Sequence, residues 1–198
     1  MSICGICAGE DAKVATCPCF LGKMCYKIKC DKKEVRKDMT TVEKVIKVLK
    51  EKGWHISFAE SCTAGMAAGR LVDVPDASTV FDASYVTYSN ESKMRLAGVQ
   101  EATIIQYGVV SEQAAREMAA GAAKTNDAQV GVGISGIAGP GGATAEKPVG
   151  MVCFGFYIDG VCHSDTKYFG AIGRNDVRMA SVSFVYERLL ELLKTGKE

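Results

Sequence analysis

Ser61 is the residue of this chain that its position favours most as a nucleophile. Residues 54–59 read as a short buried strand and residues 61–72 as a helix of small residues, so Glu60 and Ser61 fall at their junction. A hydroxyl there lies near the positive end of the helix dipole and near backbone N–H groups, which together can hold an oxyanion. The alternative is a simple helix N-cap, and the local pattern alone favours that role.

A serine nucleophile needs a base, and the chain offers histidine or lysine. His55 falls within a predicted strand and His163 beyond a hairpin turn, which gives a Ser-His-Asp triad little support. Lys93 follows the predicted strand of residues 81–88, and ligands of α/β sheets gather at strand ends. If burial lowers the pKa of Lys93, its neutral amine could accept the serine proton. Taken alone, Lys93 is more typical of a solvated surface charge.

Cys62 offers a second candidate nucleophile next to Ser61. With Glu60 and Lys93 it could form a Glu-Lys-Cys amidase site that acts through a thiolate. A small cysteine within a helix of small residues is more often a packing residue. The serine interpretation is therefore preferred.

Two further features could bind a phosphate. The loop of residues 136–142, Gly-Ile-Ala-Gly-Pro-Gly-Gly, follows a predicted strand and could present backbone N–H groups. It is neither a Walker loop nor a dinucleotide fingerprint. Arg174 and Arg178 stand at the start of the last predicted helix, where a phosphate could meet guanidinium and helix N–H groups. The alternatives without a binding role are that the loop is only a tight connection and that the two arginines are surface residues.

Cysteines mark the beginning of the chain as a separate segment, because six of the nine fall within the first thirty residues. In a reducing compartment such a cluster suggests a metal rather than disulfides. Four thiolates could hold one zinc ion, and the candidates are Cys4, Cys7, Cys17 and Cys19. Their spacing does not reproduce the paired knuckles of zinc ribbons, so an iron–sulfur cluster and free thiols stay open.

The elements that must position these residues alternate between helix and strand. Thr40 and Glu43 form a capping box for a helix that Gly53 is expected to end. This order predicts an α/β fold in which helices cover both faces of a mixed sheet. Beyond the strands already named, we predict strands at residues 129–134, 150–157 and 161–169 and helices at residues 111–124 and 175–194. The domain is expected to span residues 40–198 and to follow a Cys-rich extension at residues 1–39.

Composition narrows the range of partners. The formal net charge is only +1 and the charges are spread along the chain, so no basic face is expected to bind nucleic acid. The chain does not begin with a basic segment followed by an apolar run, and no apolar stretch approaches the length that spans a bilayer. We therefore expect a cytoplasmic protein that does not contact a membrane.

Several motifs, in order along the chain, resemble the CinA C-terminal family. They are Ala59-Glu-Ser-Cys-Thr-Ala-Gly65, Val86-Thr-Tyr-Ser-Asn-Glu-Ser-Lys-Met-Arg-Leu-Ala-Gly98, Gly108-Val-Val-Ser111, Gly136-Ile-Ala-Gly-Pro-Gly-Gly142 and Glu146-Lys-Pro-Val-Gly150. The resemblance covers roughly residues 40–195 and leaves out residues 1–39. It implies a three-layer α/β/α sandwich, deamidation of nicotinamide mononucleotide and a homo-oligomer.

The resemblance also implies roles for individual residues. Ser61 matches the family's nucleophile and Lys93 its general base, which reverses the local interpretation of both. The implied substrate-binding residues are Glu60, Thr63, Gly136, Gly139, Gly141 and Arg174. Ala64 stands where the family commonly has a second glycine. Many relatives carry a large N-terminal domain linked to nucleotide pyrophosphatase activity, which we do not assign to this chain.

The resulting hypothesis is acyl transfer that needs no metal. Lys93 accepts the Ser61 proton, the serine oxygen attacks the carboxamide, and N–H groups near the helix start hold the oxyanion. A rival of a different class is a catalytically silent binding module with a metal- or redox-responsive Cys-rich segment. An amidohydrolase acting on another pyridine or nucleotide amide is the alternative within the enzymes.

Overall fold

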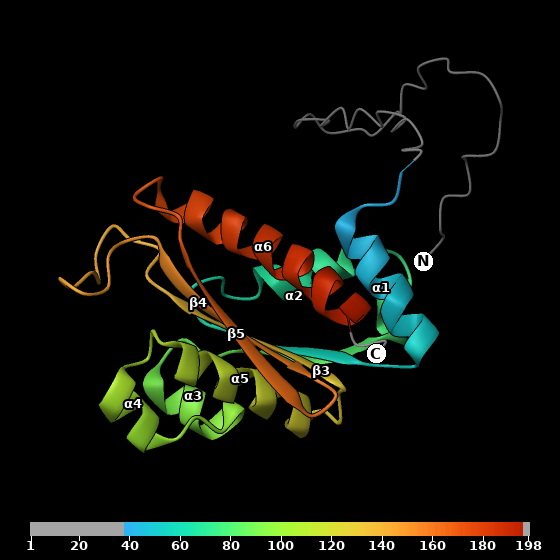
Figure 1. Cartoon of the computed structure of the whole chain (residues 1–198), viewed down its shortest axis with the longest axis horizontal. Helices are drawn as coiled ribbons and strands as arrows, with labels where there is room; N and C mark the ends of the chain where they lie inside the picture. The colour runs from blue at the N-terminus through green and yellow to red at the C-terminus, as the bar shows by residue number, and fades with distance from the viewer. Residues whose placement is uncertain (1–37, 196–198) are drawn as a thin grey trace, which may run out of the picture. The chain divides into compact units, whose positions relative to one another are not determined.

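Five strands form one mixed sheet in the computed structural model, which describes residues 38–195 (Figure 1). The strand order is β2-β1-β3-β4-β5. β1 pairs in parallel with β2 and with β3, whereas β4 is antiparallel to both of its neighbours, β3 and β5. The strands are β1 Ile56–Glu60, β2 Phe81–Val86, β3 Val130–Gly136, β4 Met151–Ile158 and β5 Val161–Tyr168.

Helices cover both faces of the sheet, which confirms the predicted three-layer α/β/α sandwich. α1, α2 and α6 lie on one face and α3, α4 and α5 on the other (Figure 1). The α-helices are α1 Thr41–Lys52, α2 Met66–Val72, α3 Asn90–Ala97, α4 Glu101–Tyr107, α5 Glu112–Thr125 and α6 Arg174–Thr195, with a 3-10 turn at Ala77–Thr79. None of the helices within residues 38–195 combines the length and the apolar character needed to cross a membrane.

The larger core lies between the sheet and the α1, α2 and α6 layer. All five residues of β1 are buried, as expected for a strand with a parallel neighbour on each side. α1 contributes Val45 and Leu49, which are fully buried. Its capping box between Thr40 and Glu43 forms as predicted, and Gly53 ends it in the left-handed conformation. Local signals therefore set both ends of this helix.

On the opposite face, α5 lies very close to the sheet because both surfaces are built from small residues. A Cβ atom added at Gly133 would stand 2.1 Å from the carbonyl oxygen of Ala115, and one added at Gly155 would stand 2.0 Å from the same oxygen. Real Cβ atoms do not approach backbone oxygens this closely. The glycines of β3 and β4 therefore set the distance between the α5 layer and the sheet.

Two predicted boundaries at the site differ in the structure. β1 begins at Ile56, so His55 lies just before the strand rather than within it, and its ring contacts the carboxylate of Asp82. α2 begins at Met66, and residues 61–65 form a turn rather than the first helical turn. Gly65, with φ of 89°, is the residue at the N-terminal boundary of α2. The prediction that Ser61 opens this helix is therefore wrong.

We expect Gly133→Ala to lower the free energy of unfolding by at least about 2 kcal/mol, because the new methyl group meets backbone that cannot move aside. The matched control is Gly69→Ala in α2, where an added Cβ meets nothing within 4 Å. That change should raise the free energy of unfolding by about 0.5–1 kcal/mol. Urea denaturation of the two variants beside the wild type measures both, and equal midpoints would contradict the close α5–sheet contact.

Candidate active site

Ser61 and Lys93 lie side by side although 32 residues separate them in the chain. Lys93 Nζ stands 3.1 Å from Ser61 Oγ. Ser61 directly follows β1, and Lys93 lies in the first turn of α3, which follows β2 after a short connection. Because β1 and β2 are parallel neighbours, their carboxyl ends meet at one edge of the sheet. The topology therefore brings the predicted pair together.

The amine of Lys93 is buried among oxygen atoms. The residue is 2% exposed, and its Nζ also lies 2.9 Å from the carbonyl oxygen of Thr87 and 3.3 Å from that of Tyr88. A neutral amine has two N–H donors and one lone pair. If the two carbonyls accept the two N–H groups, the lone pair is left to face Ser61 Oγ. This arrangement suits a base that takes the serine proton.

Burial also lowers the pKa of Lys93 below its ordinary value. Cys62 and Glu91 act in the opposite direction, but removal from water is the largest effect. Ser61 itself is only half-buried, so its hydroxyl can meet a substrate. The pair thus combines an accessible hydroxyl with an amine that loses its proton more easily than a surface lysine.

Histidine does not supply the base. His55 precedes the opposite end of β1, about 17–20 Å from Ser61 at the usual rise per strand residue. His163 lies in β5, which β3 and β4 separate from β1. The alternative of a Ser-His-Asp triad is therefore excluded by the strand order.

Cys62 is a poor nucleophile in this structure. The residue is 5% exposed, and burial raises the pKa of its thiol to about 12, even though the backbone N–H groups of Cys62 and Thr63 and the charge of Arg178 act to lower it. A thiol that keeps its proton at neutral pH does not attack a carboxamide. The Glu-Lys-Cys alternative is therefore not supported, because the raised pKa keeps the Cys62 thiol protonated.

Glu60 caps α2 from within the protein. Its fully buried carboxylate accepts hydrogen bonds from the backbone N–H groups of Gly65, Ala67 and Ala68, at 3.0, 3.1 and 2.9 Å. These N–H groups open the observed α2, and because a side chain already occupies them they are not free to hold an oxyanion. Glu60 therefore holds the turn of Ser61 in place instead of facing a substrate.

Arg174 connects three parts of the predicted substrate site. Its guanidinium donates to the carbonyl oxygen of Gly139 at 2.9 Å and to the hydroxyl of Tyr88 at 3.0 Å. Tyr88 is 62% exposed, and its own carbonyl belongs to the Lys93 environment. Arg174, the loop of residues 136–142 and the dyad thus lie at one edge of the sheet. Tyr88 and the carbonyl of Thr87 were not predicted, since backbone acceptors leave no mark in a sequence.

The two arginines expected beside each other at a phosphate have different neighbours. Arg178 turns toward the Ser61 turn and donates to the carbonyl oxygens of Cys62 and Thr63. Thr63 is fully buried, and its hydroxyl is the single buried side-chain oxygen or nitrogen without a partner among residues 38–195. Gly136 ends β3, and Gly141 is exposed at the tip of the loop.

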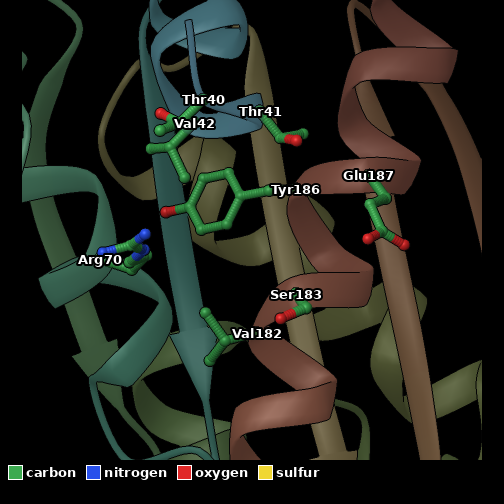
Figure 2. A pocket seen from close by; sticks show the side chains of 8 residues that line it. All are labelled: Thr40, Thr41, Val42, Arg70, Val182, Ser183, Tyr186 and Glu187. Atoms are coloured by element: carbon green, nitrogen blue, oxygen red, sulfur yellow. The ribbon is translucent and has the colours of Figure 1, made fainter. Parts of the chain in front are cut away.

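A hollow of about 300 Å³ lies between the start of α1 and helices α2 and α6. Figure 2 shows Tyr186 projecting from α6 across it toward α2. The Tyr186 hydroxyl donates to the carbonyl oxygen of Ala67 at 2.5 Å, and burial raises the pKa of Tyr186 well above its usual value. Neither Ser61 nor Lys93 lines this hollow. Tyr186, which crosses it, contacts α2 through the Ala67 carbonyl.

The predicted zinc ligands cannot be compared with the structure. Cys4, Cys7, Cys17 and Cys19 lie outside the described residues. Among residues 38–195, no group of three or more His, Cys, Asp or Glu side chains is arranged to hold a metal ion. Zinc at the beginning of the chain stays a prediction, as does the domain division at residue 40.

Comparison with known proteins agrees with the arrangement of the strands. Residues 38–193 match the CinA C-terminal domain. The chain belongs to the CinA C-terminal domain family. Its fold is similar to the crystal structure of competence/damage inducible protein CihA from Agrobacterium tumefaciens, with a TM-score of 0.74 and 38% identity, covering 77% of this chain and 93% of that one.

Curated relatives of this CinA-family chain carry two kinds of name. A CinA-like protein of Desulforapulum autotrophicum is 44% identical over 159 residues, which are 80% of this chain and 37% of that protein. Nicotinamide-nucleotide amidohydrolase PncC of Enterobacter agglomerans is 54% identical over 108 residues, which are 54% of this chain and 66% of that protein. The chain spans about a third of the length of the first curated relatives it matches.

The departure at Ala64 from the family's usual glycine falls at a strained position. Ala64 has φ of 50° in the Ser61 turn, a left-handed conformation that costs an alanine about 1 kcal/mol. We therefore expect Ala64→Gly to raise the free energy of unfolding by up to about 0.5 kcal/mol, because the greater freedom of glycine in the unfolded chain offsets about 0.4–1 kcal/mol of the relieved strain. Thermal or urea denaturation measures the change.

The control for this prediction is Ala120→Gly within α5, a half-buried alanine in regular helix. There the same substitution should lower the free energy of unfolding by about 1 kcal/mol. A loss of stability in both variants would show that Ala64 is not strained.

Proposed function

We propose that this chain is a nicotinamide-nucleotide amidohydrolase, which converts nicotinamide mononucleotide and water to nicotinic acid mononucleotide and ammonia. The observation that carries the proposal is the buried amine of Lys93 at 3.1 Å from the accessible hydroxyl of Ser61. A base next to a hydroxyl at a strand end is the arrangement that acyl transfer needs. The name of the Enterobacter agglomerans relative supports the choice of substrate.

In the first half of the reaction, Lys93 takes the proton of Ser61 while the serine oxygen bonds to the carboxamide carbon. The carbonyl oxygen becomes an oxyanion, and the positive charge of the pyridinium ring favours the attack. The C–N bond then breaks, and the proton on Lys93 passes to the leaving nitrogen, which departs as ammonia. A nicotinoyl ester remains on Ser61.

In the second half, a water molecule gives a proton to Lys93 and attacks the ester carbon. The bond between that carbon and Ser61 Oγ breaks, and the proton returns from Lys93 to the serine oxygen. Both halves use the same amine, which therefore must be neutral at the start of each. Nucleophile and base are both supplied by the chain, so we propose that the reaction requires no metal.

Arg174 is the residue we assign to the phosphate of the nucleotide. Its two partners, the Gly139 carbonyl and the Tyr88 hydroxyl, are uncharged, so neither neutralises the guanidinium. The side chain is exposed, and the contact with Tyr88 places it on the Lys93 side of the sheet edge. A guanidinium here can pair with a phosphate group while the carboxamide lies at Ser61.

We expect Ser61→Ala to lower ammonia release from nicotinamide mononucleotide by at least about 10³-fold, because the acyl acceptor is gone. Lys93→Met should lower kcat by about 10²–10⁴-fold through loss of the base. Enzymatic detection of ammonia, with product identified by chromatography, measures both, and chelator-treated wild type should keep its full rate.

Matched controls are Ser78→Ala and Lys44→Met, two exposed positions away from the site. They should leave the rate unchanged. Near wild-type turnover by Ser61→Ala would show that the dyad assignment is wrong. No ammonia from folded wild type would favour another amide substrate or the silent binding module.

The pH dependence follows from the state of Lys93. Since the neutral amine is the base, kcat/KM should rise with pH as Lys93 loses its proton and then level off. Burial lowers the pKa of Lys93, so the midpoint should lie below the ordinary value of 10.5. Initial rates across pH at constant ionic strength measure it. A midpoint at or above 10.5, or an unchanged profile in Lys93→Met, would contradict the role of the amine.

A further inference from the structure

Arg178 joins the last helix to the turn that carries Ser61. Its Nε donates to the carbonyl oxygen of Cys62 at 3.0 Å, and its Nη2 donates to that of Thr63 at 3.1 Å. The remaining Nη1 meets Asn175 Oδ1 at 3.2 Å on the same helix. The fork of one guanidinium thus holds two consecutive carbonyl groups, directly after the nucleophile.

Each of these carbonyls fixes the direction of an N–H group. A trans peptide unit is planar, and its C=O and N–H bonds point in opposite directions. Holding the Cys62 carbonyl therefore turns the Thr63 N–H away from Arg178, and holding the Thr63 carbonyl turns the Ala64 N–H away likewise. The Ala64 N–H donates to the Ser61 carbonyl at 3.2 Å, which closes the turn.

The Thr63 N–H does not close a turn in this way. In the part of the chain that the structure describes, neither it nor the Cys62 N–H donates to a protein oxygen. Both lower the pKa of the Cys62 thiol, and that sulfur in turn acts on Lys93. Since the Thr63 N–H points away from Arg178, it also points away from α6, whereas Lys93 lies on α3 at the other face of the sheet.

We propose that Arg178 is a positioning residue, which orients the Thr63 N–H, beside the Cys62 N–H, to hold the oxyanion formed when Ser61 attacks a carboxamide. The inference rests on the proposed amidohydrolase function. In this proposal the N–H groups of Cys62 and Thr63 hold the oxyanion in place of those at the start of α2, because Glu60 already accepts from the latter. An N–H from the residue after a nucleophile is a common donor in such sites, and it acts best when it is oriented before the reaction.

The rest of the turn has supports that do not involve Arg178. Glu60 holds the N–H groups at the start of α2, and Tyr186 holds the Ala67 carbonyl. Loss of Arg178 therefore leaves α2 anchored and releases chiefly the peptide units of Cys62 and Thr63. The expected defect is one of transition-state stabilisation more than of folding or substrate binding.

The test uses Arg178→Lys, which keeps the charge but has no planar fork to span both carbonyls. We expect kcat for nicotinamide mononucleotide to fall about 10–100-fold while KM changes less than about threefold. The affinity for pyridine-3-boronic acid, which forms a tetrahedral adduct with a serine oxygen, should fall by a similar factor. In Arg178→Ala, added guanidinium ion at low concentration should restore part of kcat.

Arg188→Lys is the matched control. Arg188 lies on the same helix, is half-buried and also makes two side-chain hydrogen bonds, to Asp165 and Glu191. Its substitution should leave kcat and boronate affinity unchanged. Urea denaturation gives the folded fraction of every variant, so that rates are expressed per folded molecule.

Labelling of Ser61 by an alkyl fluorophosphonate separates this inference from the choice of substrate. The serine oxygen bonds to phosphorus, fluoride leaves and Lys93 takes the proton. If the wild type releases no ammonia yet labels at Ser61, and Arg178→Lys labels about 10-fold more slowly, the substrate is wrong and the inference stands. Wild-type kcat and labelling in Arg178→Lys, or a rise in KM alone, would overturn it.

Discussion

The contact between a buried amine and a serine hydroxyl is the interaction on which the rest of this site depends. Removing a lysine charge from water costs several kcal/mol unless the amine loses its proton or gains strong partners. Lys93 has uncharged oxygen neighbours, from Ser61, Thr87 and Tyr88. None of these partners is a carboxylate that would hold the proton on the amine, and the Ser61 hydroxyl can donate to the lone pair of a neutral amine, so burial shifts the balance toward the neutral form. The parallel pairing of β1 with β2 is what brings these atoms together.

That arrangement requires a fixed turn after β1, and the turn is held from two directions. Both carboxylate oxygens of Glu60 accept from N–H groups at the start of α2. These bonds stabilise the helix, but the same N–H groups are then not available to bind an oxyanion. The helix end cannot both accept a side-chain cap and bind an oxyanion with the same N–H groups. The remaining donors lie within the turn, where α6 contacts the carbonyl side through Arg178. The last helix is thereby part of the site's support as well as of the core.

Features that short-range signals determine were predictable from the sequence. The capping box at Thr40 and the helix end at Gly53 involve neighbouring residues, and both form as expected. The start of α2 was misplaced because its cap is Glu60, a strand residue whose carboxylate reaches forward to Ala68. The direction of Arg178 was missed because its acceptors are backbone carbonyls 115 and 116 residues away. Pairing Ser61 with Lys93 depended on the family resemblance, since neither residue is distinctive alone.

The candidate site lies within the part of the chain that matches the family. Ser61, Lys93, Arg174 and Arg178 all lie within residues 38–193, and each is positioned by an element of the same sheet or of the helices packed on it. The chain spans only about a third of the length of several relatives, yet none of the contacts described above needs a residue beyond this domain. The hydroxyl of Ser61 after β1, the amine of Lys93 after β2 and the guanidinium of Arg174 on α6 lie at one sheet edge because the parallel strands and the covering helix fix their distances. The proposed chemistry therefore depends on contacts that the sandwich itself provides.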